Sequence, residues 1–119
     1  MASTPRVGVW IPNLFLRIPV DSAVRTAGGW PVTVAGESAA AGQGCVVAVV
    51  DLDAAGVAAP AAIAAMTRAG IVVLAFGPHV EAEALVAARR AGAVALPRSA
   101  FLARLPELLA TAFASVGRR

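Results

Sequence analysis

The sequence has no tyrosine, no lysine, one cysteine (Cys45) and only seven acidic residues in 119. A single cysteine excludes a disulfide framework and a zinc site built from several thiolates. The longest stretch without a formal charge, residues 54–67, contains glycine and proline and is shorter than the ~20 apolar residues of a membrane span. The N-terminus shows no basic region followed by a long apolar run. We therefore expect no signal peptide, no membrane segment and a cytoplasmic location.

The basic residues are ten arginines that are spread along the chain. Only Arg89-Arg90 and Arg118-Arg119 are adjacent, and the net charge is only +3 although the pI is about 11.1. There is no base-reading motif and no aromatic platform, so the pattern argues against nucleic-acid binding. Hydrophobic residues make up 59% of the chain, which excludes a disordered protein. We expect one domain spanning residues 1–119.

Short β-rich runs alternate with alanine-rich helical segments. The patterns predict an α/β domain with a parallel sheet covered on both faces. The predicted strands are Arg6–Ile11, Pro31–Ala35, Cys45–Val50, Ile71–Ala75 and Ala93–Leu96. The predicted helices are Leu14–Ala27, one or two turns within residues 36–44, a helix from Pro60 to Gly70, Glu81–Ala91, and a last helix from about Pro106. We expect Pro19 to kink or split the first helix, and residues 99–104 to form a turn or a brief helix.

Spacing of apolar residues predicts which side of the terminal helices faces the core. In the first helix this stripe is Phe15, Pro19, Ala23, Val24 and Ala27; in the last it is Leu105, Leu108, Leu109, Ala112, Phe113 and Val116. We expect Trp10 to lie partly in the core and Trp30 to be exposed near a sheet edge.

Polar residues follow the predicted strands where a ligand site would lie in an open α/β sheet. The third strand ends at Asp51 and Asp53, and the fifth is followed by Arg98 and Ser99. Asn13 follows the first strand and can cap the helix after it. His79, the only histidine, follows the fourth strand, where a capping or solvent-facing role is the simplest interpretation. Cys45 is interpreted as an inert packing residue.

Two segments carry a family resemblance. The run VVAVVDLDAAG (residues 46–56) and the run AARRAGAVALPRSAF (residues 87–101) resemble the receiver domain of bacterial two-component response regulators. The resemblance implies a three-layer, flavodoxin-like fold with a five-stranded parallel sheet of order 2-1-3-4-5. It also implies that Asp51 occupies the place of the receiver's phosphoacceptor aspartate.

The sequence departs from receivers around that aspartate. Receivers hold Mg²⁺ partly through acids after the first strand, where this chain has Ile11-Pro12-Asn13. Receivers have a switch threonine or serine at the end of the fourth strand, and that position matches Ala75, Gly77 or Pro78 here. The lysine that follows the fifth strand of receivers matches Arg98. We therefore expect a degenerate pseudo-receiver in which Asp51 pairs with Arg98. A cofactor is not expected. If Asp51 is phosphorylated after all, Mg²⁺ would be needed, with Asp51, Asp53 and Asn13 as its ligands.

The resemblance implies a signalling or protein-interaction module, and no enzyme motif such as GxGxxG or a P-loop is present. We expect it to work without phosphorylation, as a homodimer or bound to a partner protein. The expected contact face comprises Glu81–Ala91, Ala93–Leu96 and Leu105–Val116. The alternatives are an active receiver phosphorylated at Asp51, a small-ligand or nucleotide-binding module using the same rim, and a structural subunit of a larger complex.

Overall fold

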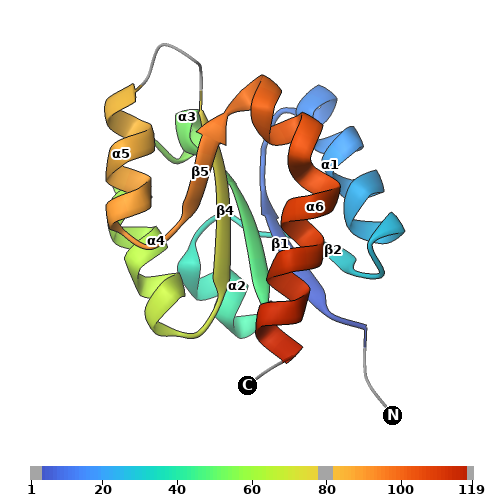
Figure 1. Ribbon diagram of the computed structural model, residues 1–119. Coiled ribbons are helices and arrows are strands. Elements are labelled where there is room, and N and C mark those ends of the chain that lie inside the picture. The colour runs from blue at the N-terminus through green and yellow to red at the C-terminus, as the bar shows by residue number, and fades with distance from the viewer. Residues whose placement is uncertain (1–3, 78–81, 118–119) are drawn as a thin grey trace.

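Five parallel strands form one sheet in the computed structural model, which describes residues 4–77 and 82–117 (Figure 1). The strands are β1 (Arg6–Trp10), β2 (Trp30–Thr33), β3 (Val47–Asp51), β4 (Val72–Gly77) and β5 (Val94–Pro97). Their order is β2-β1-β3-β4-β5, which confirms the expected topology. All five residues of β3 are buried, as a continuous apolar run at the centre of a parallel sheet predicts.

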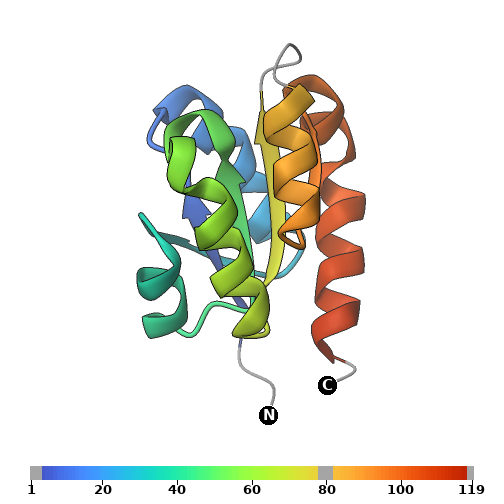
Figure 2. The same ribbon diagram turned by 90° about the vertical axis from the view of Figure 1, so that its left-hand side faces the viewer.

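Helices cover both faces of the sheet. α1 (Leu14–Thr26) and α6 (Arg98–Gly117) pack on one face, and α2 (Glu37–Gly42), α4 (Ala59–Arg68) and α5 (Ala82–Arg90) pack on the other (Figures 1 and 2). Because successive strand residues point to opposite faces, β3 feeds both layers: Val47 and Val49 join the cluster under α1 and α6, whereas Ala48 and Val50 join the other. The two hydrophobic layers therefore share their strands.

The inward stripe predicted for α1 is wrong at its start. Phe15 is 87% exposed and Pro19 is also exposed, whereas Val20 and Val24 are fully buried and Leu16 is partly buried. The prediction was wrong because the apolar pattern at the start of α1 continues around the helix, so spacing alone did not reveal which side faces the sheet. α1 also runs unbroken through Pro19. The amide missing at Pro19 lies on the exposed side, where water can bind the carbonyl left unpaired.

α6 differs from its prediction at its beginning. The helix starts at Arg98 and continues through Pro106, where a new helix was expected. Figure 1 shows the first turns of α6 at an angle to the rest. Pro106 lies on the exposed side, so its missing donor is tolerated. The predicted stripe is confirmed, with Leu105, Leu109 and Ala112 buried, and Phe101 extends it by one turn.

α6 is also long and apolar enough, by length and composition, to cross a membrane. Residues 98–116 reach a mean hydropathy of 1.2. One side of this helix, however, is buried against β4 and β5 of the sheet. The buried side carries Phe101, Leu105, Leu109 and Ala112, so α6 has the pattern of an amphipathic helix that covers a sheet.

On each edge strand of the sheet, one backbone group is not free to bind another strand: β2 lacks an N–H at a proline, and a carbonyl of β5 is bound by an arginine. In β2, Trp30 and Val34 donate their amides toward the β1 side, so Pro31, between them, has its backbone directed outward. Because proline has no N–H, this outer edge lacks a donor there. At the other edge, Nε and Nη2 of Arg89 donate to the carbonyl of Ala95 at 3.0 and 2.8 Å.

Candidate functional site

The carboxyl ends of the strands meet at one rim. In the sheet register Trp10 lies beside Val50, and Asp51 lies beside Phe76. The next pair along is Gly77 and Pro97, after which Arg98 begins α6. The structure thus brings Asn13, Asp51, Asp53, Arg98 and Ser99 to one end of the sheet, as the topology predicts. His79 and Pro78 lie outside the described residues.

Asp51 is the one buried polar or charged residue in the part of the chain that the structure describes, with 6% of its surface exposed. It caps α3 (Leu52–Ala55), and its Oδ1 accepts a hydrogen bond from the Asp53 amide at 3.0 Å. Burial raises the pKa of the Asp51 carboxyl, and the nearby Asp53 charge adds to this. The amides of Ala54 and Asp53 and the charge of Arg98 act in the opposite direction. Burial is the largest effect, so this carboxylate is less stable in its charged form than an exposed one.

The expected ion pair between Asp51 and Arg98 is not formed. The ion pairs between described residues join Arg17 to Asp21 at 3.1 Å and Arg104 to Glu107 at 3.6 Å. Asp51 ends β3 and Arg98 follows β5, with β4 between these two strands. Two strand spacings amount to nearly 10 Å, and Arg98 is exposed at the start of α6. Arg98 lowers the pKa of Asp51 only through space.

Asn13 acts as a helix cap. Its Oδ1 accepts the Phe15 amide at 2.9 Å, which leaves this oxygen engaged at the start of α1. Within residues 4–77 and 82–117, no three His, Cys, Asp or Glu residues gather where they could hold a metal ion. A hard cation such as Mg²⁺ takes six oxygen ligands, of which several are usually waters and one or two are carboxylates. Among the described donors, the Asp51 and Asn13 oxygens are engaged as helix caps, and the position after β1 where the receiver resemblance implies acids has Pro12 and Asn13 instead.

The remaining rim residues are placed as follows. Asp53 and Ser99 are exposed in the first turns of α3 and α6. Ala75 and Gly77, two of the positions that match the receiver's switch hydroxyl, are buried in β4 and have no hydroxyl. Cys45 is buried, and burial raises the pKa of its thiol, as an inert packing residue requires.

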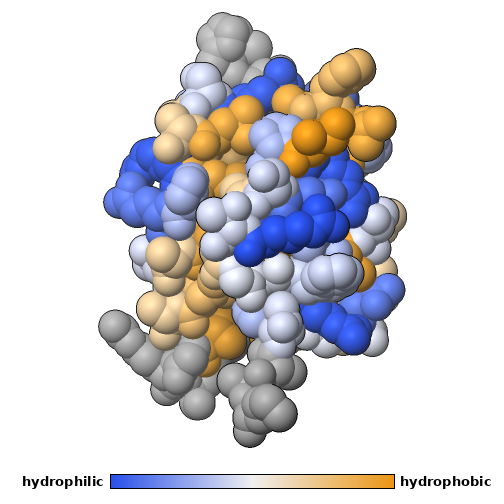
Figure 3. Space-filling view, turned by 90° about the vertical axis from the view of Figure 1, so that its right-hand side faces the viewer, coloured by the Kyte–Doolittle hydropathy of each residue, from blue (hydrophilic) through white to orange (hydrophobic). Residues whose placement is uncertain are grey.

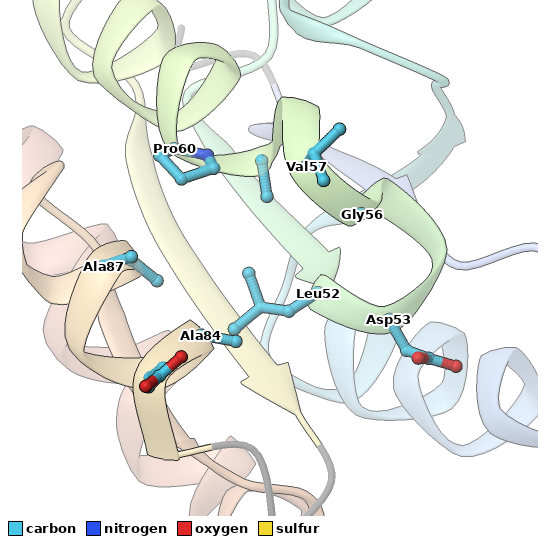
Figure 4. Close-up of a pocket in the computed structure, with 10 residues that line it drawn as sticks. Leu52, Asp53, Gly56, Val57, Pro60, Ala84 and Ala87 are labelled. Carbon is cyan, nitrogen blue, oxygen red and sulfur yellow. The ribbon is translucent and has the colours of Figure 1, made fainter.

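Sequence reasoning missed a groove of about 500 Å³ beside the rim. Its walls are the segment from α3 to the start of α4, including the 3₁₀ turn η1 (Gly56–Ala58), and the facing side of α5. Figure 4 shows Leu52 directed into this space and Asp53 directed away from it. The lining contains Asp53 and Glu83 but no basic side chain, which does not suit a phosphate group. The alanines along α4 and α5 are the signal that could have indicated it, because small facing side chains leave space between helices.

Comparison with known proteins agrees with this geometry at the level of the fold. No family model and no curated protein matches the sequence. Among solved structures, the chain resembles a response regulator from Thermotoga maritima, with a TM-score of 0.69, 18% identity, and coverage of 92% of this chain and 99% of that one. It also resembles a receiver domain protein from Clostridium thermocellum, with a TM-score of 0.74, 11% identity, and coverage of 93% and 95%.

A third similar structure is an atypical orphan response regulator, described as revealing a new phosphorylation-independent regulatory mechanism. The TM-score is 0.64, the identity is 18%, and the match covers 89% of this chain and 95% of that one. At these identities the likeness defines the fold. The chain has the receiver fold, and Asp51 and Asp53 are the acidic residues at the end of its central strand.

Proposed function

We propose that this protein is a cytoplasmic, receiver-like signalling module that acts by binding another protein and does not require phosphorylation. The observation that carries the proposal is the setting of Asp51: a buried carboxylate used as a helix cap, with no group of three His, Cys, Asp or Glu residues around it in the part of the chain that the structure describes. Attack of a carboxylate on a phosphoryl group needs its charge neutralised. The proposal excludes an enzymatic role.

One of the similar structures supports this reading. Its description attributes phosphorylation-independent regulation to an atypical orphan response regulator of the same fold. A receiver fold can therefore serve signalling without the phosphoryl group. For this chain, the same conclusion is our proposal from the chemistry of the rim.

The expected partner surface is the face formed by α5, β5 and α6. Val86 on α5 and Val94 on β5 are exposed at 41% and 44%. Arg104 and Glu107 form an exposed ion pair on α6, which packs against β5 from the other face of the sheet. Apolar side chains with polar residues at their margin are what a protein-binding surface offers. We place a partner protein or a second copy on this face.

Phosphorylation is tested by incubating the protein with acetyl phosphate and Mg²⁺ and measuring the intact mass. We expect no phosphate adduct in the wild type. The matched control is Asp51→Asn, which has nearly the same shape and cannot form an acyl phosphate. An adduct that appears in the wild type and is lost in Asp51→Asn would show an active receiver and overturn the proposal.

A further inference from the structure

The fold gathers arginines that are far apart in the sequence at one end of the sheet. Helices that connect parallel strands run back toward the amino ends of the strands, so their last turns lie there. Those last turns carry Arg25 in α1, Arg68 in α4, and Arg89 and Arg90 in α5. Arg6 begins β1 at the same end. The amino ends of the strands therefore lie among basic side chains.

The acidic residues do not share this end. Among the described residues, they lie where a helix begins or a strand ends, or within a helix in an ion pair (Glu37, Asp51, Asp53 and Glu83; Asp21 and Glu107). Figure 3 shows strongly hydrophilic (blue) surface at its lower right, toward the end where β2 begins. Charge of one sign gathered at one end of a molecule attracts ligands of the opposite sign.

A pocket of about 630 Å³ lies at this end of the sheet, within the size range of small-ligand sites. Arg6 of β1 and Trp30 of β2 are direct neighbours in the sheet register, and both line the pocket. The other described residues of its lining are neutral: Thr4, Pro5, Gln43, Gly44 and Val46. We call this space the amino-end pocket. Its one charged side chain among these residues is a cation.

Arg6 and Trp30 offer contacts to two different parts of one ligand. Nη1 of Arg6 donates to the Gln43 carbonyl at 3.0 Å, which fixes the guanidinium at the pocket wall. Its Nε and Nη2 have no hydrogen-bond partner among the described residues, and these two donors form the parallel pair that binds a phosphate. Trp30 is 55% exposed, and Arg25 lies over its ring at 5.5 Å. An exposed indole held by such a contact can stack against a flat ring.

We propose that the amino-end pocket binds a nucleotide, with the base stacked on Trp30 and the phosphate held by Arg6. One ring beside one guanidinium matches a single nucleotide. A nucleic-acid strand needs several stacking side chains, and the other exposed aromatic residue of the described chain, Phe15, lies at the far end of α1. The pocket and the rim that carries Asp51 are at opposite ends of the sheet, so this inference does not depend on the proposed function.

Titration with the four ribonucleoside monophosphates, followed by heteronuclear magnetic resonance, tests the site. We expect the indole N–H signal of Trp30 to shift and that of Trp10, which packs against the other end of the α2–α4–α5 layer, to stay. Purine nucleotides should bind more tightly than pyrimidine nucleotides, because the larger ring stacks over more of the indole. Inorganic phosphate alone and a nucleoside alone should each bind about tenfold more weakly, since each keeps one of the two contacts. A Trp30 signal that no nucleotide moves overturns the proposal.

Two variants separate a site from general attraction by the basic end. Arg6→Gln removes the paired donors and should weaken nucleotide binding about tenfold while leaving nucleoside binding unchanged. The matched control is Arg68→Gln, which removes the same charge outside the pocket and should weaken binding less than about twofold. Both side chains are exposed, so the fold should be kept. Equal losses in the two variants overturn the proposal. A single-stranded oligonucleotide that binds more tightly than every mononucleotide overturns it in favour of a nucleic-acid surface.

Discussion

Asp51 contributes to the pH dependence of stability through its burial, which raises the pKa of its carboxyl above the unfolded value of about 3.9. The native state then binds the proton more tightly than the unfolded chain. The stabilisation from this group is complete below about pH 3.9 and is lost as pH rises through the folded-state pKa. At pH 7 the ionised carboxylate therefore lowers the free energy of unfolding.

We predict that Asp51→Asn raises Tm at pH 7 by a few degrees. The amide oxygen can still accept the Asp53 N–H, so the cap on α3 is kept. The advantage should shrink toward pH 4, as the wild-type carboxyl becomes protonated. Thermal unfolding followed by circular dichroism at both pH values measures this. Glu83→Gln, at an exposed carboxylate on α5, should not reproduce the effect. A lower Tm for Asp51→Asn at pH 7 would contradict the assignment.

The guanidinium of Arg89 adds a polar contact to the apolar packing between α5 and β5. Arg89 donates two hydrogen bonds to the Ala95 carbonyl, whereas Arg90, which is exposed like Arg89, makes no side-chain hydrogen bond to a described residue. We predict that Arg89→Ala lowers the free energy of unfolding by about 1 kcal/mol, since charge-assisted bonds to a backbone carbonyl are lost. Arg90→Ala should change it by less than about 0.5 kcal/mol. Urea denaturation of the two variants compares them directly, and equal effects would refute the role of Arg89.

The elements themselves were largely predictable from the sequence. Strand and helix order follows from apolar runs alternating with alanine-rich segments, and the sheet order agreed with the receiver resemblance. The side of α1 that faces the sheet was not predictable. The first turn of this helix carries apolar residues on more than one side, and nothing in their spacing marks Phe15 as exposed. The start of α6 was missed because a proline normally begins a helix, and here the exposed position of Pro106 allows it inside one.

The site was predictable only in part. Sequence order and topology place Asn13, Asp51 and Arg98 at one rim, and the structure agrees. Whether two of those side chains meet depends on distances across strands, which spacing along the chain does not contain. The Asp51–Arg98 pair failed because the Arg98 side chain is exposed at the start of α6, whereas the groove beside α5 was missed although the alanines of α4 and α5 indicate space between these helices.

At the scale of the whole molecule, the two hydrophobic layers share the strands of one sheet, and residues of β3 feed both. Loss of one layer would expose the other side of the same strands, so we predict a single cooperative unfolding transition. Trp10 packs partly against the α2–α4–α5 layer. In a Trp30→Phe variant its fluorescence reports on that layer alone. The fluorescence and far-ultraviolet circular dichroism curves in urea should coincide, and separate midpoints would show independent unfolding.

Pro31 and the Arg89–Ala95 contact have a consequence for how the protein behaves at high concentration. An open sheet can grow by adding strands from other molecules, which leads to aggregation. Here one border strand lacks an amide on its outer side, and a carbonyl of the other is already taken by an arginine. Polymerisation by strand addition is therefore disfavoured at both borders of the sheet. Contacts between copies are left to the helical surfaces, where they can form and dissociate without opening the fold.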